Sequence, residues 1–184
     1  RGSDEAFGFD GCVVNVRAAD KYISKISEKT GIDEDKISVC TSKDLAGQVW
    51  DQEGRIRQEF SKIWVMEEKY TGKSAASKLS DIRAELEKSL HGDKNYLYLI
   101  SSLDDIAWIF NIRADDLPET PAVFAYAAIY SDRAVLYTGE GAADGSVTAY
   151  LKSQGVENAP YSPECLCLKV PENCKVLCDF ARTS

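Results

Sequence analysis

Short apolar segments alternate with amphipathic ones along most of this chain, and that alternation limits the folds it can adopt. Residues 96–100 and 123–130 are apolar almost throughout, which is typical of strands buried on both faces. The segment 74–90 is polar with an apolar stripe at helical spacing, formed by Leu79, Ile82, Leu86 and Leu90. The pattern predicts an α/β fold with a mixed sheet and helices covering both of its faces.

The ends of the expected helices carry capping residues. Ser74 can cap the helix over 74–90, and Gly31 follows a helix expected over 18–30. The charged side chains of the helix over 74–90 are expected to face solvent: Lys78, Asp81, Glu85 and Lys88. Further helices are expected over 44–50, 102–110 and 146–154. Further strands are expected at 6–9, 36–40, 63–66 and 133–137, and near Cys165 and Val176.

Size and charge exclude several classes of protein. A chain of 184 residues can bury a core without a metal or a disulfide. Its 22 basic and 30 acidic side chains give a net charge of −8, which disfavours nucleic acid and anionic membrane as partners. No apolar run approaches the ~20 residues of a membrane span. We therefore expect neither a nucleic-acid nor a membrane partner.

The chain is expected to form one domain with a short unrelated start. Arg1-Gly2-Ser3 resembles an expression scar, so residues 1–5 are assigned to a disordered start and residues 6–184 to the domain. The polar segment 51–61, which contains Gly54, is the candidate hinge.

Four of the six cysteines gather near the C-terminal end, where their spacing matches no zinc motif: Cys165, Cys167, Cys174 and Cys178. Alternation in 165–168 instead indicates a strand with both of its thiols on one face. Reduced structural thiols are the expected state, with a metal site and disulfides as the alternatives. Reduced thiols indicate a cytoplasmic protein.

Two glycine-containing motifs could bind phosphate groups, but each departs from the required pattern. Gly72-Lys73-Ser74 lacks the earlier glycine of a phosphate-binding loop, because Glu67 stands there. Gly139-Glu140-Gly141 follows a strand and precedes a helix, but its third glycine is misplaced for a dinucleotide site. A capped turn and an exposed loop are the expected structures.

Carboxylates and the single histidine are the remaining candidates for chemistry. Asp104, Asp105, Asp115 and Asp116 could bind a divalent cation, although the first two also suit the first turn of a helix. His91 stands at a helix end, where a contact with the helix dipole is expected. We assign no catalytic, cofactor-binding or metal-binding residue in this chain.

The string from Leu103 to Arg113, LDDIAWIFNIR, is distinctive. Together with Pro118, Pro121 and Phe124-Ala125-Tyr126, it resembles the second, non-catalytic N-terminal domain of the Xaa-Pro aminopeptidase (aminopeptidase P) family of creatinase/prolidase-type proteins. The likeness extends over nearly the whole chain. It departs from the family pattern at Ala114-Asp115, at Glu119-Thr120 and in the segment after Trp50.

The resemblance implies a three-layer, RNase H-like α/β domain. It implies that the longer parent is a hydrolase that removes residues preceding proline, using a divalent metal, commonly manganese, in a separate catalytic domain. This chain alone is then expected to be inactive and free of cofactor. Its implied partners are the catalytic domain and the first N-terminal domain of the same polypeptide, proline-containing peptides as substrate, and a second copy of the full-length protein.

Interdomain contact is expected at the string around Trp108. The candidate contact residues are Asp105, Trp108, Asn111, Arg113 and Asp115, with an ordinary solvated connection as the alternative. The competing functions are a catalytically inactive scaffold that binds protein or peptide, and an independent domain that binds a small molecule.

Overall fold

The computed structural model describes residues 7–10, 13–40, 45–54, 59–161, 170 and 172–183. Contacts divide the chain into two units: the first unit is Arg1–Gln58 with Asp179–Ser184, and the second unit is Glu59–Cys178. The division falls within the predicted hinge range 51–61. The expected disordered start, residues 1–5, lies outside the described residues.

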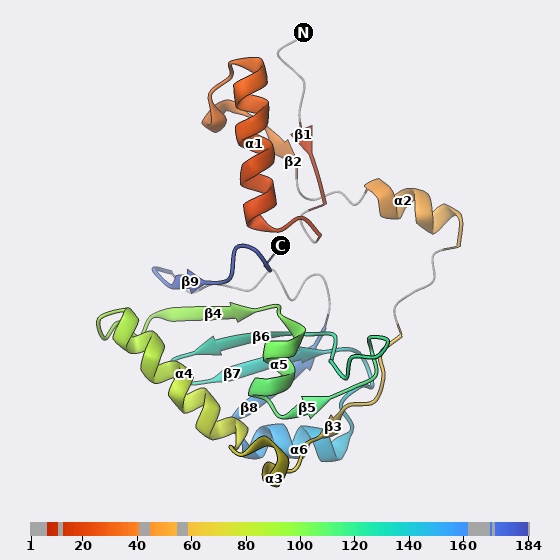
Figure 1. The fold of residues 1–184 in the computed structure, drawn as a ribbon, viewed down its shortest axis with the longest axis vertical. Helices are drawn as coiled ribbons and strands as arrows, with labels where there is room; N and C mark the ends of the chain where they lie inside the picture. The colour runs from red at the N-terminus through yellow and green to blue at the C-terminus, as the bar shows by residue number, and fades with distance from the viewer. Residues whose placement is uncertain are drawn as a thin grey trace. The chain divides into compact units, whose positions relative to one another are not determined.

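A five-stranded sheet in the order β8-β7-β6-β4-β9 forms the centre of the second unit (Figure 1). Its strands are β4 (Tyr96–Ile100), β6 (Ala125–Tyr130), β7 (Ala134–Thr138), β8 (Val156–Pro160) and β9 (Lys175–Leu177). The pairs β4–β6 and β6–β7 are antiparallel, whereas β7–β8 and β4–β9 are parallel. The predicted mixed sheet is therefore confirmed.

The described residues of the second unit also form a short strand pair and several helices. A separate antiparallel pair joins β3 (Trp64–Val65) to β5 (Ile112–Arg113). The helices are α3 (Glu68–Thr71), α4 (Ala75–Ser89), α5 (Leu103–Ile109) and α6 (Gly145–Ser153). Both the strand β5 and the strand β8 were missed by the sequence prediction, because β5 has only two residues and β8 is interrupted by polar side chains.

Local sequence explains most of these boundaries. Ser74 accepts a hydrogen bond from the N–H of Ser77 at 3.2 Å, so the predicted cap of α4 is confirmed. The strands β6 and β7 are joined through Ser131-Asp132, and the Tyr130 N–H donates to the Arg133 carbonyl at 2.9 Å. This bond closes a two-residue hairpin loop.

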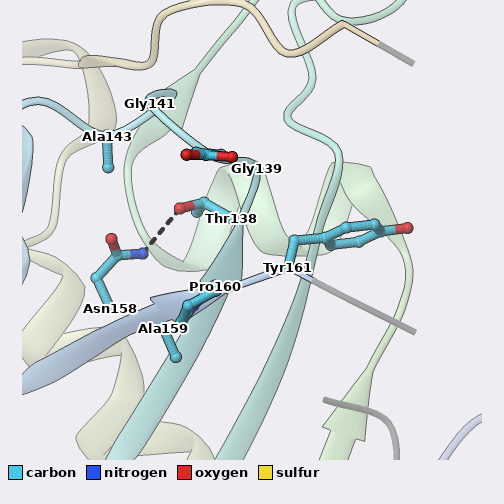
Figure 2. A pocket seen from close by; sticks show the side chains of 9 residues that line it. Thr138, Gly139, Gly141, Ala143, Asn158, Ala159, Pro160 and Tyr161 are labelled. Atoms are coloured by element: carbon cyan, nitrogen blue, oxygen red, sulfur yellow. Dashed lines mark hydrogen bonds between the residues drawn. The ribbon is translucent and has the colours of Figure 1, made fainter. Parts of the chain in front are cut away.

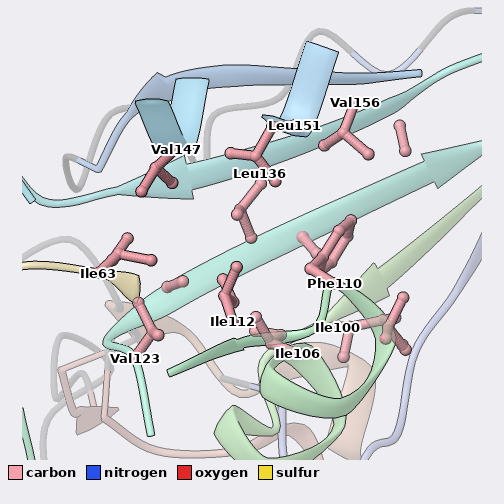
Figure 3. Close-up of a cluster of buried hydrophobic side chains, with 14 of the residues drawn as sticks. Ile63, Ile100, Ile106, Phe110, Ile112, Val123, Leu136, Val147, Leu151 and Val156 are labelled. Atoms are coloured by element: carbon pink, nitrogen blue, oxygen red, sulfur yellow. The ribbon is translucent and has the colours of Figure 1, made fainter. Parts of the chain in front are cut away.

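The main core lies on one face of the sheet (Figure 3). Alternate residues of β6, including Ala127 and Ile129, point into it and meet side chains such as Leu79 of α4, Ile106 of α5 and Leu151 of α6. The opposite face carries a second, smaller cluster, formed by Leu97, Ala128, Tyr130 and Val135. The helices α4, α5 and α6 contribute side chains to the first cluster and none to the second.

Among the described residues of the second unit, the apolar side chains of these helices therefore gather on the face that carries the main core. The apolar strands predicted that both faces are buried, but this pattern does not say which element covers each face. The strand expected near Cys165, with Cys167, lies outside the described residues, as does Cys12.

The first unit contains a parallel pair, β1 (Phe7–Gly8) with β2 (Val39–Cys40), connected through α1 (Val16–Thr30) and a 3₁₀ turn at Glu34–Lys36. The helix α2 (Leu45–Gln52) follows. Asn15 caps α1 through a 2.8 Å bond from the Ala18 N–H, and Gly31 ends it at φ 72°. No residue of α1 is buried.

None of the described helices combines the length and the apolar character that crossing a bilayer requires.

Candidate functional site

The end of α5 is held by Asn111, which adopts the left-handed conformation at φ 54°. Asparagine tolerates this conformation better than most residues, which explains why the helix can end here without glycine. Its side chain is 2% exposed and its Nδ2 donates to the Lys73 carbonyl at 2.9 Å. Its carbonyl accepts the Met66 N–H at 2.8 Å. Asn111 therefore joins the end of α5 to the chain on either side of α3.

Lys78 of α4 lies under this helix end and is only 2% exposed. Its Nζ donates to Asn111 Oδ1 at 2.6 Å and to the Trp108 carbonyl at 2.7 Å, and it lies 4.2 Å from the centroid of the Trp108 ring. Burial, and then the charge of Arg113, hold the pKa of Lys78 below its ordinary value. The ammonium group is thus bound by two neutral acceptors and an aromatic face.

The prediction that Lys78 faces solvent is wrong. Lys78 follows Ala75 by three residues and precedes Ile82 by four, so it stands within the apolar stripe of α4 rather than opposite to it. That spacing could have predicted that Lys78 is buried. The prediction relied instead on the charge of lysine, which usually places it in solvent.

Arg113 is half-buried in β5 and also binds the end of α5. Its Nη1 donates to the Ala107 carbonyl at 2.7 Å and to the Ile112 carbonyl at 2.8 Å. Trp64 of β3 is its directly opposite partner in the strand pair and is 40% exposed. The carbonyls at the end of α5 therefore receive hydrogen bonds from two cationic side chains, which suits the negative end of a helix dipole.

The other residues predicted for interdomain contact lie on the surface. Trp108 is 56% exposed although its ring covers the Lys78 ammonium group, and both Asp105 and Asp115 are exposed. Asn111 differs, because it is buried and its polar atoms are bonded within the second unit. It supports this surface from below.

Asp116 fixes the loop that follows β5. One carboxylate oxygen accepts the Ser61 N–H at 2.6 Å, and the other accepts the Phe124 N–H at 2.8 Å. The carboxylate thus joins the two ends of the segment 116–124 to each other, and it joins both to the residues before β3. Sequence reasoning grouped Asp116 with Asp115 as a candidate metal ligand, whereas its oxygens serve the backbone.

A cavity of about 460 Å³ opens at the ends of β7 and β8 (Figure 2). Asn158 Nδ2 donates to Thr138 Oγ1 at 2.9 Å on its wall. The rest of the lining comes mainly from the loop after β7 and the end of β8: Gly139, Glu140, Gly141, Ala143, Ala159, Pro160 and Tyr161. The glycine motif at 139–141 therefore lines a hollow, but the buried polar groups there already bond to each other.

Close packing explains Gly139. A Cβ atom at this position would lie 2.0 Å from Cγ of Phe60, well inside contact distance. The first glycine of the motif is therefore needed for packing against an aromatic ring. This requirement is independent of any phosphate group.

The second glycine motif, Gly72-Lys73-Ser74, has a structural role. Gly72 ends α3 at φ 71°, and Lys73 pairs with Asp81. Within the described ranges, no group of three or more His, Cys, Asp or Glu side chains is placed to hold a metal ion. Cys174 and Cys178 are free thiols.

The second unit is thus an α/β domain whose most developed polar feature is a braced surface at α5 and β5. The sequence profile of the Creatinase/Prolidase N-terminal domain matches residues 54–184, which is most of the chain. The chain belongs to this family. This confirms the family recognised from the string around Trp108.

Curated relatives of the chain are much longer than it is. A probable Xaa-Pro aminopeptidase P of Sordaria macrospora is 34% identical over 155 residues, covering 84% of this chain and 24% of the relative. The corresponding protein of Botryotinia fuckeliana is 33% identical over 155 residues, covering 84% of this chain and 22% of the relative. The chain spans about a quarter of the length of these relatives.

A solved structure supports the fold. The X-prolyl aminopeptidase of Caenorhabditis elegans, described as a cytosolic enzyme with a di-nuclear active site, matches with a TM-score of 0.71 at 20% identity. The match covers 85% of this chain and 24% of that protein. With the family match, it confirms the predicted fold class, the creatinase/prolidase N-terminal type of α/β domain with a mixed sheet.

Proposed function

We propose that this chain is a non-catalytic N-terminal part of an Xaa-Pro aminopeptidase and that the second unit positions a separate catalytic domain. The observation that carries the proposal is the surface at α5 and β5, where exposed Trp108 is backed by buried Lys78 and Asn111. A surface braced in this way loses little conformational freedom when a partner docks on it. Relatives named as Xaa-Pro aminopeptidases support the activity proposed for the parent.

The metal of the proposed parent belongs elsewhere in the longer polypeptide. The described residues offer no set of three ligating side chains, so they do not fit a di-nuclear centre like the one named for the worm enzyme. We propose a divalent metal, manganese by family resemblance, in the catalytic domain. Proline-containing peptides are the proposed substrates, and a cytoplasmic location is supported by the worm enzyme's description.

The first unit supports a neighbouring domain as a second partner. A parallel strand pair with one crossover helix is a fragment of a doubly covered sheet, and such sheets bury both faces. Because α1 has no buried residue, we propose that β1, α1 and β2 belong to the first N-terminal domain of the same polypeptide. This replaces the single domain over residues 6–184 that the sequence suggested.

Activity measurements test the proposal directly. Hydrolysis of an Xaa-Pro peptide with manganese present is measured for this chain and for the full-length product of the same gene. We expect no turnover by the chain and metal-dependent turnover by the full-length protein. Cleavage by the chain alone would overturn the non-catalytic role. An inactive full-length protein that still binds such peptides would instead establish the scaffold function.

Dimerisation of the full-length protein is a further part of the proposal that rests on family resemblance alone. Sedimentation of the full-length product over a range of concentrations tests it, because a dimer dissociates on dilution.

A further inference from the structure

Two cationic side chains meet at the end of α5 without a carboxylate partner among the described residues. Lys78 is bound by the Trp108 carbonyl and Asn111 Oδ1, and Arg113 Nη1 is bound by the carbonyls of Ala107 and Ile112. No described carboxylate forms an ion pair with either side chain. Burial, and after it the positive charge of Arg113, lower the pKa of Lys78.

The end of the helix does not balance these charges. The negative end of a helix dipole is equivalent to about half of an elementary charge, and α5 has less than two full turns. Two full positive charges therefore leave a local surplus, in a chain whose net charge is −8. A negative group is the missing complement at this place.

Arg113 is prepared to receive such a group. Its two bonds from Nη1 fix the plane of the guanidinium, while Nε and Nη2 bond to no acceptor in the described part of the chain. A fixed guanidinium with two neighbouring donors matches the two oxygens of a carboxylate.

Two exposed tryptophans belong to the backbone segments next to Arg113. Trp64 is the cross-strand partner of Arg113, and Trp108 lies one residue after Ala107, whose carbonyl binds Nη1. They are 40% and 56% exposed. Tryptophan and arginine are the residues most enriched among the anchors of protein interfaces.

We propose that Arg113 binds an Asp or Glu carboxylate carried by another segment of the same longer polypeptide, with Trp64 and Trp108 packing against the apolar neighbours of that carboxylate. The proposal rests on the proposed function, because it names the chemistry by which the catalytic part docks on the second unit. Relatives that are about four times as long as the matched region supply a polypeptide in which such a segment exists.

Photo-crosslinking in the full-length protein tests the proposal. Benzoylphenylalanine replaces Trp64 or Trp108, and the crosslinked peptides are mapped by mass spectrometry. Tyr70, which is 70% exposed in the same unit, is the matched control position. We expect positions 64 and 108 to crosslink to one peptide outside the 184 residues that contains Asp or Glu, and position 70 to crosslink elsewhere.

Charge substitution then separates the possible outcomes. Arg113→Gln is expected to lower the crosslink yield from position 64 by about tenfold, whereas Arg133→Gln, at an exposed arginine of the same unit, leaves it unchanged. A second variant, Arg113→Lys, keeps the charge and is expected to restore part of the yield. The melting temperature of the second unit shows that each variant is folded.

Three results would overturn the inference. If Arg113→Gln folds and leaves the yield unchanged, the carboxylate is absent although the docking surface and the proposed function remain. If positions 64 and 108 crosslink to nothing beyond the 184 residues, both the inference and the positioning role fall. A yield that rises with concentration and maps to a second copy would replace the proposed partner with a dimer.

Discussion

The helices α1 and α4 have the same length of 15 residues and similar caps, yet their surroundings differ completely. Asn15 caps α1 and Ser74 caps α4, each by accepting a backbone N–H three residues later. The described residues leave no side chain of α1 buried, whereas α4 buries Ala75, Lys78 and Leu79. Capping and spacing therefore specify where a helix begins and ends, but they do not specify how much of it is buried.

The size of the neighbouring sheet explains this difference. The strands β1 and β2 have two residues each, and their pair is the whole described sheet of the first unit. The second unit has five strands, with apolar residues on alternate positions of β6 and β7. Only the larger sheet gives a helix enough apolar area to bury its stripe.

Cutting back one apolar side chain in each helix gives the largest expected contrast. Leu79→Ala should lower the free energy of unfolding of the second unit by about 4 kcal/mol, because Leu79 is 1% exposed within the main core. Ile23→Ala, on the half-buried face of α1, should cost the first unit less than about 1 kcal/mol. Hydrogen exchange, read separately for each unit, measures both effects. Equal losses would contradict the comparison.

Asn111 tests whether the second unit also depends on buried polar contacts. Asn111→Ala should destabilise it by about 3 kcal/mol, because the Lys78 ammonium group loses an acceptor and alanine is strained at φ 54°. Asn173 is the control, since it has φ 61° but is exposed. Asn173→Ala should cost only about 1 kcal/mol. Urea unfolding measures both variants. If they lose the same free energy of unfolding, backbone strain alone accounts for the two losses.

Gly139 tests packing at the cavity of the second unit. Gly139→Ala should cost about 1–3 kcal/mol, because its Cβ must displace the ring of Phe60. Gly145→Ala, where no atom lies within 4 Å of the added Cβ, should be neutral or stabilising by up to about 1 kcal/mol. Thermal unfolding distinguishes the two variants, and a neutral Gly139→Ala would mean that Phe60 moves freely.

The smallest expected effect is the pH dependence of α6. Bonds from the Ser146 side chain and from the N–H groups of Val147 and Ser146 hold the pKa of Asp144 below its ordinary 3.8. Because the folded pKa is the lower one, the carboxylate contributes stability above about pH 3.8 and loses it as pH falls through the folded pKa. Asp144→Asn keeps a capping oxygen and should remove this dependence. Carboxyl chemical shifts and stability measured between about pH 6 and pH 2 test both statements.

Local sequence was enough to predict most of the fold. The strand at 96–100 and the ends of α1 and α4 follow from patterns a few residues long. The strands β5 and β8 depend on pairing with partners distant in sequence, and so they were not predicted.

The residues that form the candidate surface were predicted only in part. The string around Trp108 contains several of them, but Lys78 and Trp64 come from other elements and reach the surface only through tertiary packing. Asn111 was predicted as a candidate contact residue, whereas its buried bonds to Lys78 and Lys73 could not be predicted from the sequence.

The position of β9 has a consequence for how the domain is made. β4 pairs with β6 on one side and with β9 on the other, and β9 is the last strand of the unit to be synthesised. Until it emerges from the ribosome, the Tyr96–Ile100 strand, which has neither charge nor proline, has an unpaired edge. The nascent domain therefore passes through a stage in which it is open to intermolecular β-pairing, and chaperone demand should be highest just before residues 175–177 are added.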